Sequence, residues 1–152
     1  MKFERAILVV FLGNYLINNV VAAIVALIPA STGGGIFTPQ YISFVLLSAA
    51  LVAGLAWWCG KSDVKSGAIF GAIGFAVAIV TAFVSGISGV ILQTGSLSQA
   101  MTVIPNFWPF LANWSTLVLL AYWVLPAAAV GWYFGRGNTA HSMGGEAPKP
   151  IF

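Results

Sequence analysis

The chain has 152 residues, of which 60% are hydrophobic and only 6% are charged. A soluble domain carries about 25% charged residues, and so few charges cannot cover a water-facing surface without leaving large apolar patches. The composition therefore excludes a soluble globular fold. A single cysteine excludes an internal disulfide and a multi-cysteine metal site. No basic stripe with interleaved aromatic residues is present, so we expect no nucleic-acid partner.

Four apolar segments are each long enough to cross the hydrocarbon core of a bilayer, which takes a helix of about 20 residues. In chain order they cover approximately residues 6–28, 42–60, 67–92 and 112–134. We predict an all-α fold: an integral membrane four-helix bundle of two antiparallel helical hairpins, forming a single domain over residues 1–135. A polar tail rich in glycine and proline follows over residues 136–152.

The distribution of charge predicts how the spans are oriented. Every charged residue lies before the first span, between the second and third, or after the fourth: Lys2, Glu4, Arg5, Lys61, Asp63, Lys65, Arg136, Glu146 and Lys149. Short loops rich in lysine and arginine stay on the cytoplasmic side of a membrane. We therefore expect both termini and the middle loop to be cytoplasmic, in a multi-pass protein of a prokaryotic cytoplasmic or intracytoplasmic membrane.

The first span contains the deepest polar side chains of the predicted membrane domain. Asn14 and Asn18 are four residues apart and share one face of a helix, whereas Asn19 points about 100° away from Asn18. A side-chain amide in lipid needs hydrogen-bond partners. We expect the pair to join helices; the alternative is that it lines a polar pathway or binds a cofactor.

The third span carries a stripe of small residues at alternating steps of four and three, which keeps them on one face of a helix. Its members are Gly67, Gly71, Gly74, Ala78, Thr81, Ser85 and Ser88. Small residues let membrane helices approach closely. The second span has a shorter match in Ala49, Ala53, Ala56 and Gly60, so we expect these two spans to pack as a tight hairpin. A lipid or cofactor groove, or a docked partner helix, is the alternative use of the stripe.

The residues that usually carry membrane chemistry are missing from the spans, which contain no Asp, Glu, Lys, Arg or His. Proton relays and ion-coupled carriers work through such groups, so neither is expected. His141 in the tail has no cysteine or carboxylate at ligand spacing and predicts no metal site. No catalytic set is present, and we expect the chain by itself not to be an enzyme. Lipids are the expected bound molecules; no other cofactor is indicated.

These observations favour a non-catalytic accessory subunit of a larger membrane complex, with other membrane subunits and the lipid bilayer as its partners. Such a subunit would pack through the small-residue stripe and through the tail, whose apolar end, Pro150, Ile151 and Phe152, is a candidate docking segment. The alternative is a small homo-oligomeric channel or carrier for an uncharged solute, lined by Asn14 and Asn18.

Overall fold

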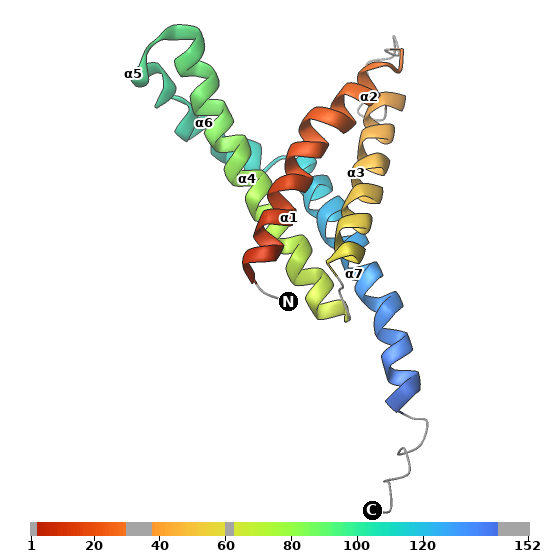
Figure 1. Ribbon diagram of the computed structural model, residues 1–152. Helices are drawn as coiled ribbons and strands as arrows, with labels where there is room; N and C mark the ends of the chain where they lie inside the picture. The colour runs from red at the N-terminus through yellow and green to blue at the C-terminus, as the bar shows by residue number, and fades with distance from the viewer. Residues whose placement is uncertain (1–2, 30–37, 60–62, 143–152) are drawn as a thin grey trace, which may run out of the picture.

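The computed structural model describes residues 3–29, 38–59 and 63–142, which are almost entirely helical (Figure 1). Its elements are α1 (Phe3–Leu16), the π-helix η1 (Ile17–Val21), α2 (Ala22–Ala26), α3 (Pro39–Trp58), α4 (Val64–Thr94), α5 (Leu97–Ala100), α6 (Val103–Leu111) and α7 (Trp114–Ser142). Four helical stretches are long and apolar enough to cross a membrane: Arg5–Ala26, Pro39–Trp58, Val64–Thr94 and Trp114–Arg136. The predicted all-α class is therefore confirmed for the described residues, and four helices have the length and apolarity that the predicted spans require.

Local side-chain chemistry sets where the central helices begin and end. Thr38 caps α3 by accepting a hydrogen bond from the backbone N–H of Tyr41 at 3.1 Å, and Pro39 occupies the first helical position, where its missing N–H costs nothing. Asp63 caps α4 in the same way, accepting from the N–H of Ser66 at 3.2 Å. At the other end of α4, Gly95 adopts a left-handed conformation with φ of 66°, which stops the helix.

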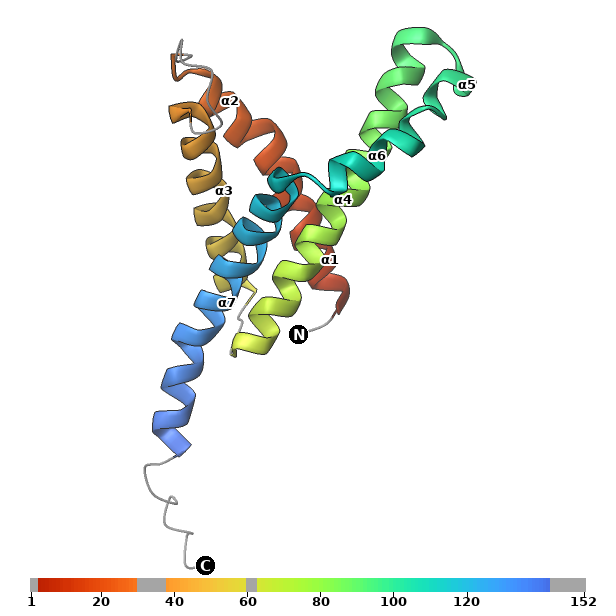
Figure 2. The same ribbon diagram turned by 180° about the vertical axis from the view of Figure 1, so that it is seen from behind.

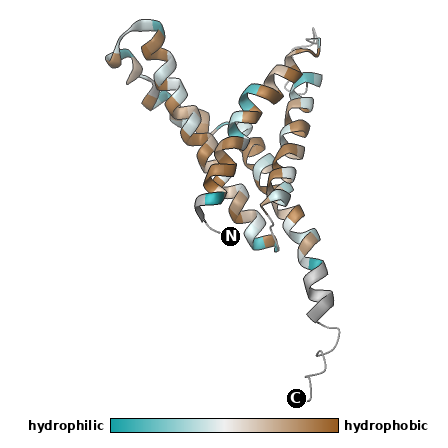
Figure 3. Cartoon of the chain, in the orientation of Figure 1, coloured by the Kyte–Doolittle hydropathy of each residue, from teal (hydrophilic) through white to brown (hydrophobic). Residues whose placement is uncertain are grey.

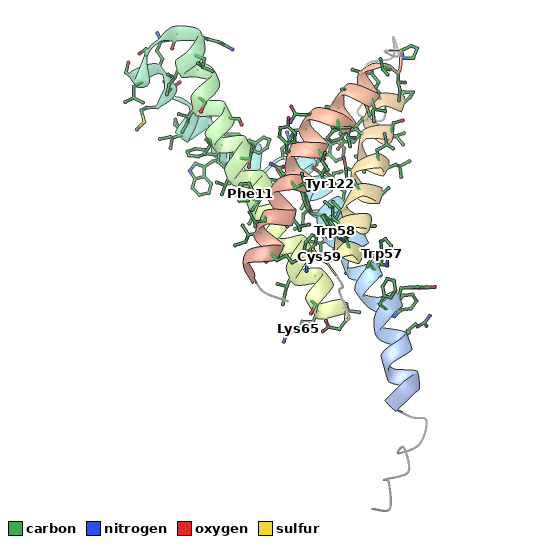
Figure 4. All side chains as sticks on the ribbon, viewed as in Figure 1. Phe11, Trp57, Trp58, Cys59, Lys65 and Tyr122 are labelled. Atoms are coloured by element: carbon green, nitrogen blue, oxygen red, sulfur yellow. The ribbon has the colours of Figure 1, made fainter. Side chains whose placement is uncertain are left out.

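The helices alternate in direction and form a V rather than a closed bundle. The start of α1, the end of α3, the start of α4 and the C-terminal part of α7 lie at one end of the molecule (Figures 1 and 4). We call it the charged end because Arg5, Asp63, Lys65 and Arg136 belong to these segments. At the opposite, uncharged end, α4 with α5 and α6 diverges from α2 and α3, as the view from behind also shows (Figure 2). Hydrophobic residues cover most of the long helices (Figure 3).

The tightest packing in the V is the crossing of α4 over α7 near the charged end. Gly67, Gly71 and Gly74 lie directly against α7; a Cβ atom at Gly71 would lie 2.5 Å from the carbonyl oxygen of Trp123. Gly131 of α7 lies equally close to the backbone at the start of α4. Glycines on both helices therefore bring the two backbones into contact, as small residues do in membrane proteins.

The predicted pairing of the second and third spans is wrong. The helix α4 touches α3 only slightly and packs along α7 instead, while α3 packs mainly on α7 and, to a lesser extent, on α1. Three glycines of the predicted stripe, Gly67, Gly71 and Gly74, meet α7, and that helix contributes a glycine of its own, Gly131, far along the chain. The small residues Ala49, Ala53 and Ala56 of α3 did not outweigh this two-sided fit, and Gly60 lies outside the described residues.

Trp123 of α7 fills the centre of the molecule. Its side chain is fully buried, and its indole ring lies against Gly74 of α4 and Gly13 of α1, where any Cβ atom would collide with it or with Leu55. The buried apolar residues around it come from all four candidate spans: Ala6, Val9, Val10, Ile17, Val52, Leu55, Ala56, Phe70, Ala78, Tyr122 and Ala127. One indole thus joins three of the four spans.

The connection between the third and fourth spans is helical, which the sequence analysis did not anticipate. The short helices α5 and α6 fold back along α4, and Phe107 of α6 packs against Phe83 of α4 with ring centroids 4.9 Å apart. The candidate fourth span ends at Arg136, but its helix, α7, continues to Ser142, into the segment that was predicted to be a polar tail. The candidate docking residues Pro150, Ile151 and Phe152 lie outside the described residues.

The crossing predicts a contrast between two glycines in helix interiors. Changing Gly71→Ala places a methyl group against the α7 backbone and forces the helices apart, so we expect a loss of about 1–3 kcal/mol in the free energy of unfolding. The matched control is Gly54→Ala in α3, where a Cβ atom meets nothing within 4 Å; it should be neutral or slightly stabilising. Denaturant unfolding of the purified protein in detergent measures both. Equal effects would contradict the close crossing.

Candidate functional site

A cleft opens where α4 begins to diverge from the rest of the molecule. It has a volume of about 690 Å³ and lies between α1 with η1, α4, and the facing parts of α3, α6 and α7. Its lining residues are Phe11, Asn14, Tyr15, Asn18, Asn19, Phe44, Ala78, Thr81, Ala82, Ser85, Phe110, Leu119 and Tyr122. Amides, hydroxyls and aromatic rings dominate this surface, in a chain whose spans are otherwise almost wholly apolar.

The asparagines of the cleft are held by a π-helical turn. In η1 the backbone N–H groups reach back five residues instead of four, as in the bond from Ala22 to the carbonyl of Ile17. The side-chain amide of Asn18 donates to the carbonyl oxygen of Asn14 at 2.9 Å and to its Oδ1 at 3.1 Å. The amide of Asn19 donates to the carbonyl of Tyr15 at 2.9 Å. These side chains satisfy carbonyls of the preceding turn, so the amides and the π turn stabilise one another.

The π turn also corrects one expectation about the asparagines. On a regular α-helix Asn19 would point away from the face shared by Asn14 and Asn18, yet all three line the cleft. A π-helix has more residues per turn than an α-helix, so consecutive side chains are separated by a smaller angle. Asn14 is buried, with 6% of its surface exposed, whereas Asn18 and Asn19 are exposed at the cleft.

The opposite wall of the cleft carries two hydroxyls of the small-residue stripe. Thr81 and Ser85 lie one helical turn apart on α4 and both line the cleft. Between the two walls stands Tyr122 of α7, at the centre of the molecule (Figure 4). Its ring packs edge-on against Phe44 of α3, with centroids 6.4 Å apart. Polar groups from α1, η1 and α4 therefore face one another across an aromatic floor.

The structure divides the predicted site residues into two groups. Six residues meet at the cleft: Asn14, Asn18, Asn19, Ala78, Thr81 and Ser85. The glycines of the stripe, Gly67, Gly71 and Gly74, lie instead at the crossing with α7. Ser88, the last member, is exposed beyond the cleft. The half of the stripe nearer the charged end therefore packs within the chain, and the half nearer the uncharged end does not.

The sequence analysis missed the aromatic residues of the cleft. Phe11, Phe44, Phe110 and Tyr122 come from four separate elements, and nothing in their spacing indicates a common site. Tyr122 had one signal, its position beside a tryptophan in the middle of a span.

A second, apolar groove of about 470 Å³ lies between α3 and α7, with Ala49, Ala121 and Pro126 in its lining.

The chemistry available in the cleft is hydrogen bonding without charge. Its lining contains no Asp, Glu, Lys, Arg or His, and the described residues contain no group of histidine, cysteine or carboxylate side chains that could hold a metal ion. The residues present can bind and orient an uncharged molecule.

Comparison with known proteins found no matching family model, no matching curated protein and no matching solved structure.

The π turn leads to a prediction about stability. Changing Asn18→Leu removes both hydrogen bonds to Asn14, and we expect a loss of about 0.6 kcal/mol, at most about 2, in the free energy of unfolding, as for other hydrogen bonds in membrane helices. The matched control is Asn106→Leu in α6, where a similar amide donates to the Thr102 carbonyl at 3.0 Å on an exposed turn. Denaturant titration in detergent compares them. An equal or larger loss in the control would refute a stabilising role for the Asn18 amide.

Proposed function

We propose that this chain is a non-catalytic accessory subunit of a larger membrane protein complex. The proposal rests on the small-residue face of α4, of which only the half nearer the charged end is covered by another helix of this chain. Nearer the charged end, Gly67, Gly71 and Gly74 are covered by α7. Nearer the uncharged end, Ser88 is exposed and a Cβ atom at Gly89 would meet nothing within 4 Å.

A vacant small-residue face has a specific meaning in a lipid solvent. Apolar side chains such as leucine can face lipid without cost, so their exposure indicates nothing. Small and hydroxyl-bearing residues instead gain most when another helix approaches closely and accepts their hydrogen bonds. Ser88 and Gly89 continue the face that the chain already uses for its tightest contact, so a helix of another subunit is the partner that fits them.

A lack of reactive groups supports the non-catalytic part of the proposal. Apart from Arg5, Lys65 and Arg136 at the charged end, the candidate spans of the described residues carry no ionisable acid or base other than tyrosine. The chain would therefore contribute packing surface, bound lipid and position to the complex, while its partners contribute the chemistry. The tail, including Pro150, Ile151 and Phe152, would add a second attachment.

We also propose that the charged end faces the cytoplasm, in a prokaryotic cytoplasmic or intracytoplasmic membrane. Arg5, Lys65 and Arg136 come from three separate segments and gather at one end, as lysine and arginine do on the cytoplasmic side. Arg136 lies over the Trp132 ring, 3.8 Å from its centroid, a contact suited to the headgroup region.

Cysteine labelling tests the orientation. In a Cys59→Ser background, which has no other cysteine, Ser98→Cys lies at the uncharged end and Lys65→Cys at the charged end. With a membrane-impermeant maleimide on intact cells, we expect Ser98→Cys to be labelled and Lys65→Cys to be labelled only after permeabilisation. The reverse pattern would overturn the assigned orientation.

Assembly tests the accessory role. Gentle detergent extraction, size-exclusion chromatography and mass spectrometry should recover the native chain in a large particle with stoichiometric, unrelated subunits. Gly89→Leu blocks the close approach of a partner helix, and we expect the share of the chain in that particle to fall by about tenfold, which corresponds to about 1.4 kcal/mol. The control is Val80→Leu, on the other side of α4, where the side chain is already 60% exposed.

Recovery of the native chain alone, as a monomer or small homo-oligomer, would overturn the accessory role. It would favour the second candidate, a homo-oligomeric channel or carrier for an uncharged solute, which the polar cleft supports. Replacing Asn14 and Asn18 with leucine then separates the two. A pathway lining predicts lost solute flux with assembly intact, whereas a packing role predicts weakened assembly.

A further inference from the structure

The cleft at the divergence of α4 has unused hydrogen-bonding groups at both walls. Asn14 is 94% buried and accepts a hydrogen bond from Asn18 through its Oδ1, but its Nδ2 donates to no atom of the described residues. The hydroxyls of Thr81 and Ser85 likewise make no hydrogen bond within the described part of the chain, although both line the cleft. Lipid tails cannot satisfy such groups, so a molecule with its own donors or acceptors fits the cleft.

The depth of the cleft determines the charge of that molecule. Asn14 and Asn18 lie near the middle of the span Arg5–Ala26, and the cleft lining has no acidic, basic or histidine side chain. A phosphate or ammonium headgroup at that depth would lack a counter-charge, and such groups are strongly disfavoured within the bilayer. The polar part of the ligand is therefore uncharged.

The aromatic lining indicates the shape of the polar part. Phe11 and Tyr15 come from α1, Phe44 from α3, Phe110 from α6 and Tyr122 from α7, and all five line the same volume. Aromatic side chains pack favourably against another flat ring, either offset-stacked or edge-on. Ala78 and Ala82 have short side chains on the α4 wall of the cleft, which leaves room for a ring between the two polar walls.

We propose that the cleft binds a lipid whose head is an uncharged planar ring carrying carbonyl or hydroxyl groups, the chemistry of the prenylated quinones and quinols. The Asn14 amide donates to one ring oxygen, while Thr81 and Ser85 donate to, or accept from, the opposite oxygen. The apolar tail leaves through the open side of the cleft into the bilayer. The volume of about 690 Å³ lies within the range of small-molecule pockets.

The cleft is built within one chain, so ligand binding there does not depend on the proposed accessory role. Ser88 and Gly89, the face proposed for a partner helix, are not part of the cleft lining. A chain that binds the ring lipid but forms no complex would retain this site and lose the accessory role. A chain that assembles into a complex but binds no ring lipid would keep the accessory role and lose the ligand site.

Binding to the purified full-length chain tests the site. The probe is decylubiquinone, added in increasing amounts to the protein in phosphatidylcholine nanodiscs, with bound probe counted by native mass spectrometry. We expect saturable binding of one probe per chain. The double variant Thr81→Val and Ser85→Ala removes two hydroxyls with little change in size, and should weaken binding by about tenfold, the factor expected for about 1.4 kcal/mol of lost hydrogen bonding.

The matched control is Ser88→Ala, which removes a hydroxyl from the same face of α4 outside the cleft and should bind the probe as the unmodified chain does. Three outcomes would overturn the proposal. The first is no saturable binding to the unmodified chain, as expected if the cleft holds only water or a partner helix. The second is equal weakening in Ser88→Ala. The third is displacement of the probe by decanol at equal concentration, which would show that the cleft selects a hydrocarbon tail and not the ring.

Discussion

The rest of the structure depends on the contact between the α4 and α7 backbones. Two helices approach this closely only where side chains are absent, and here glycines on both helices provide the space. The Trp123 ring, held between Gly74 and Gly13, extends the contact to α1. Because straight helices in contact at one end must separate at the other unless they are parallel, a tight crossing near the charged end produces the V.

The open end of the V explains why polar groups are tolerated in so apolar a chain. The Asn18 and Asn19 amides satisfy carbonyls of the preceding turn in the π-helix, and π turns are frequent at functional sites. Three hydrogen-bonding groups of the cleft lining take no part in such internal bonds: the side-chain N–H of Asn14 and the hydroxyls of Thr81 and Ser85. The proposed ring-lipid site and the packing contact with α7 therefore occupy neighbouring stretches of one face of α4.

Much of the fold could be predicted from the sequence, because span length and charge placement are strong local signals. The stripe from Gly67 to Ser88 also includes the three glycines, Gly67, Gly71 and Gly74, that meet α7. Its partner could not be predicted, since Gly131 stands alone in the fourth span and only the folded chain brings it against Asp63. The π turn was hidden for a similar reason: Asn18 and Asn19 favour it only once their amides meet the carbonyls of Asn14 and Tyr15.

The length of α4 has a mechanical consequence. Its 31 residues extend about 46 Å at 1.5 Å per residue, whereas the hydrocarbon core is about 30 Å thick. A helix longer than the core is accommodated by tilting or by local thickening of the bilayer. Because α4 is fixed to α7 near one end, a change in its tilt displaces mainly its other end, with α5 and α6. Hydrophobic mismatch therefore acts mainly on the part of α4 that bounds the cleft.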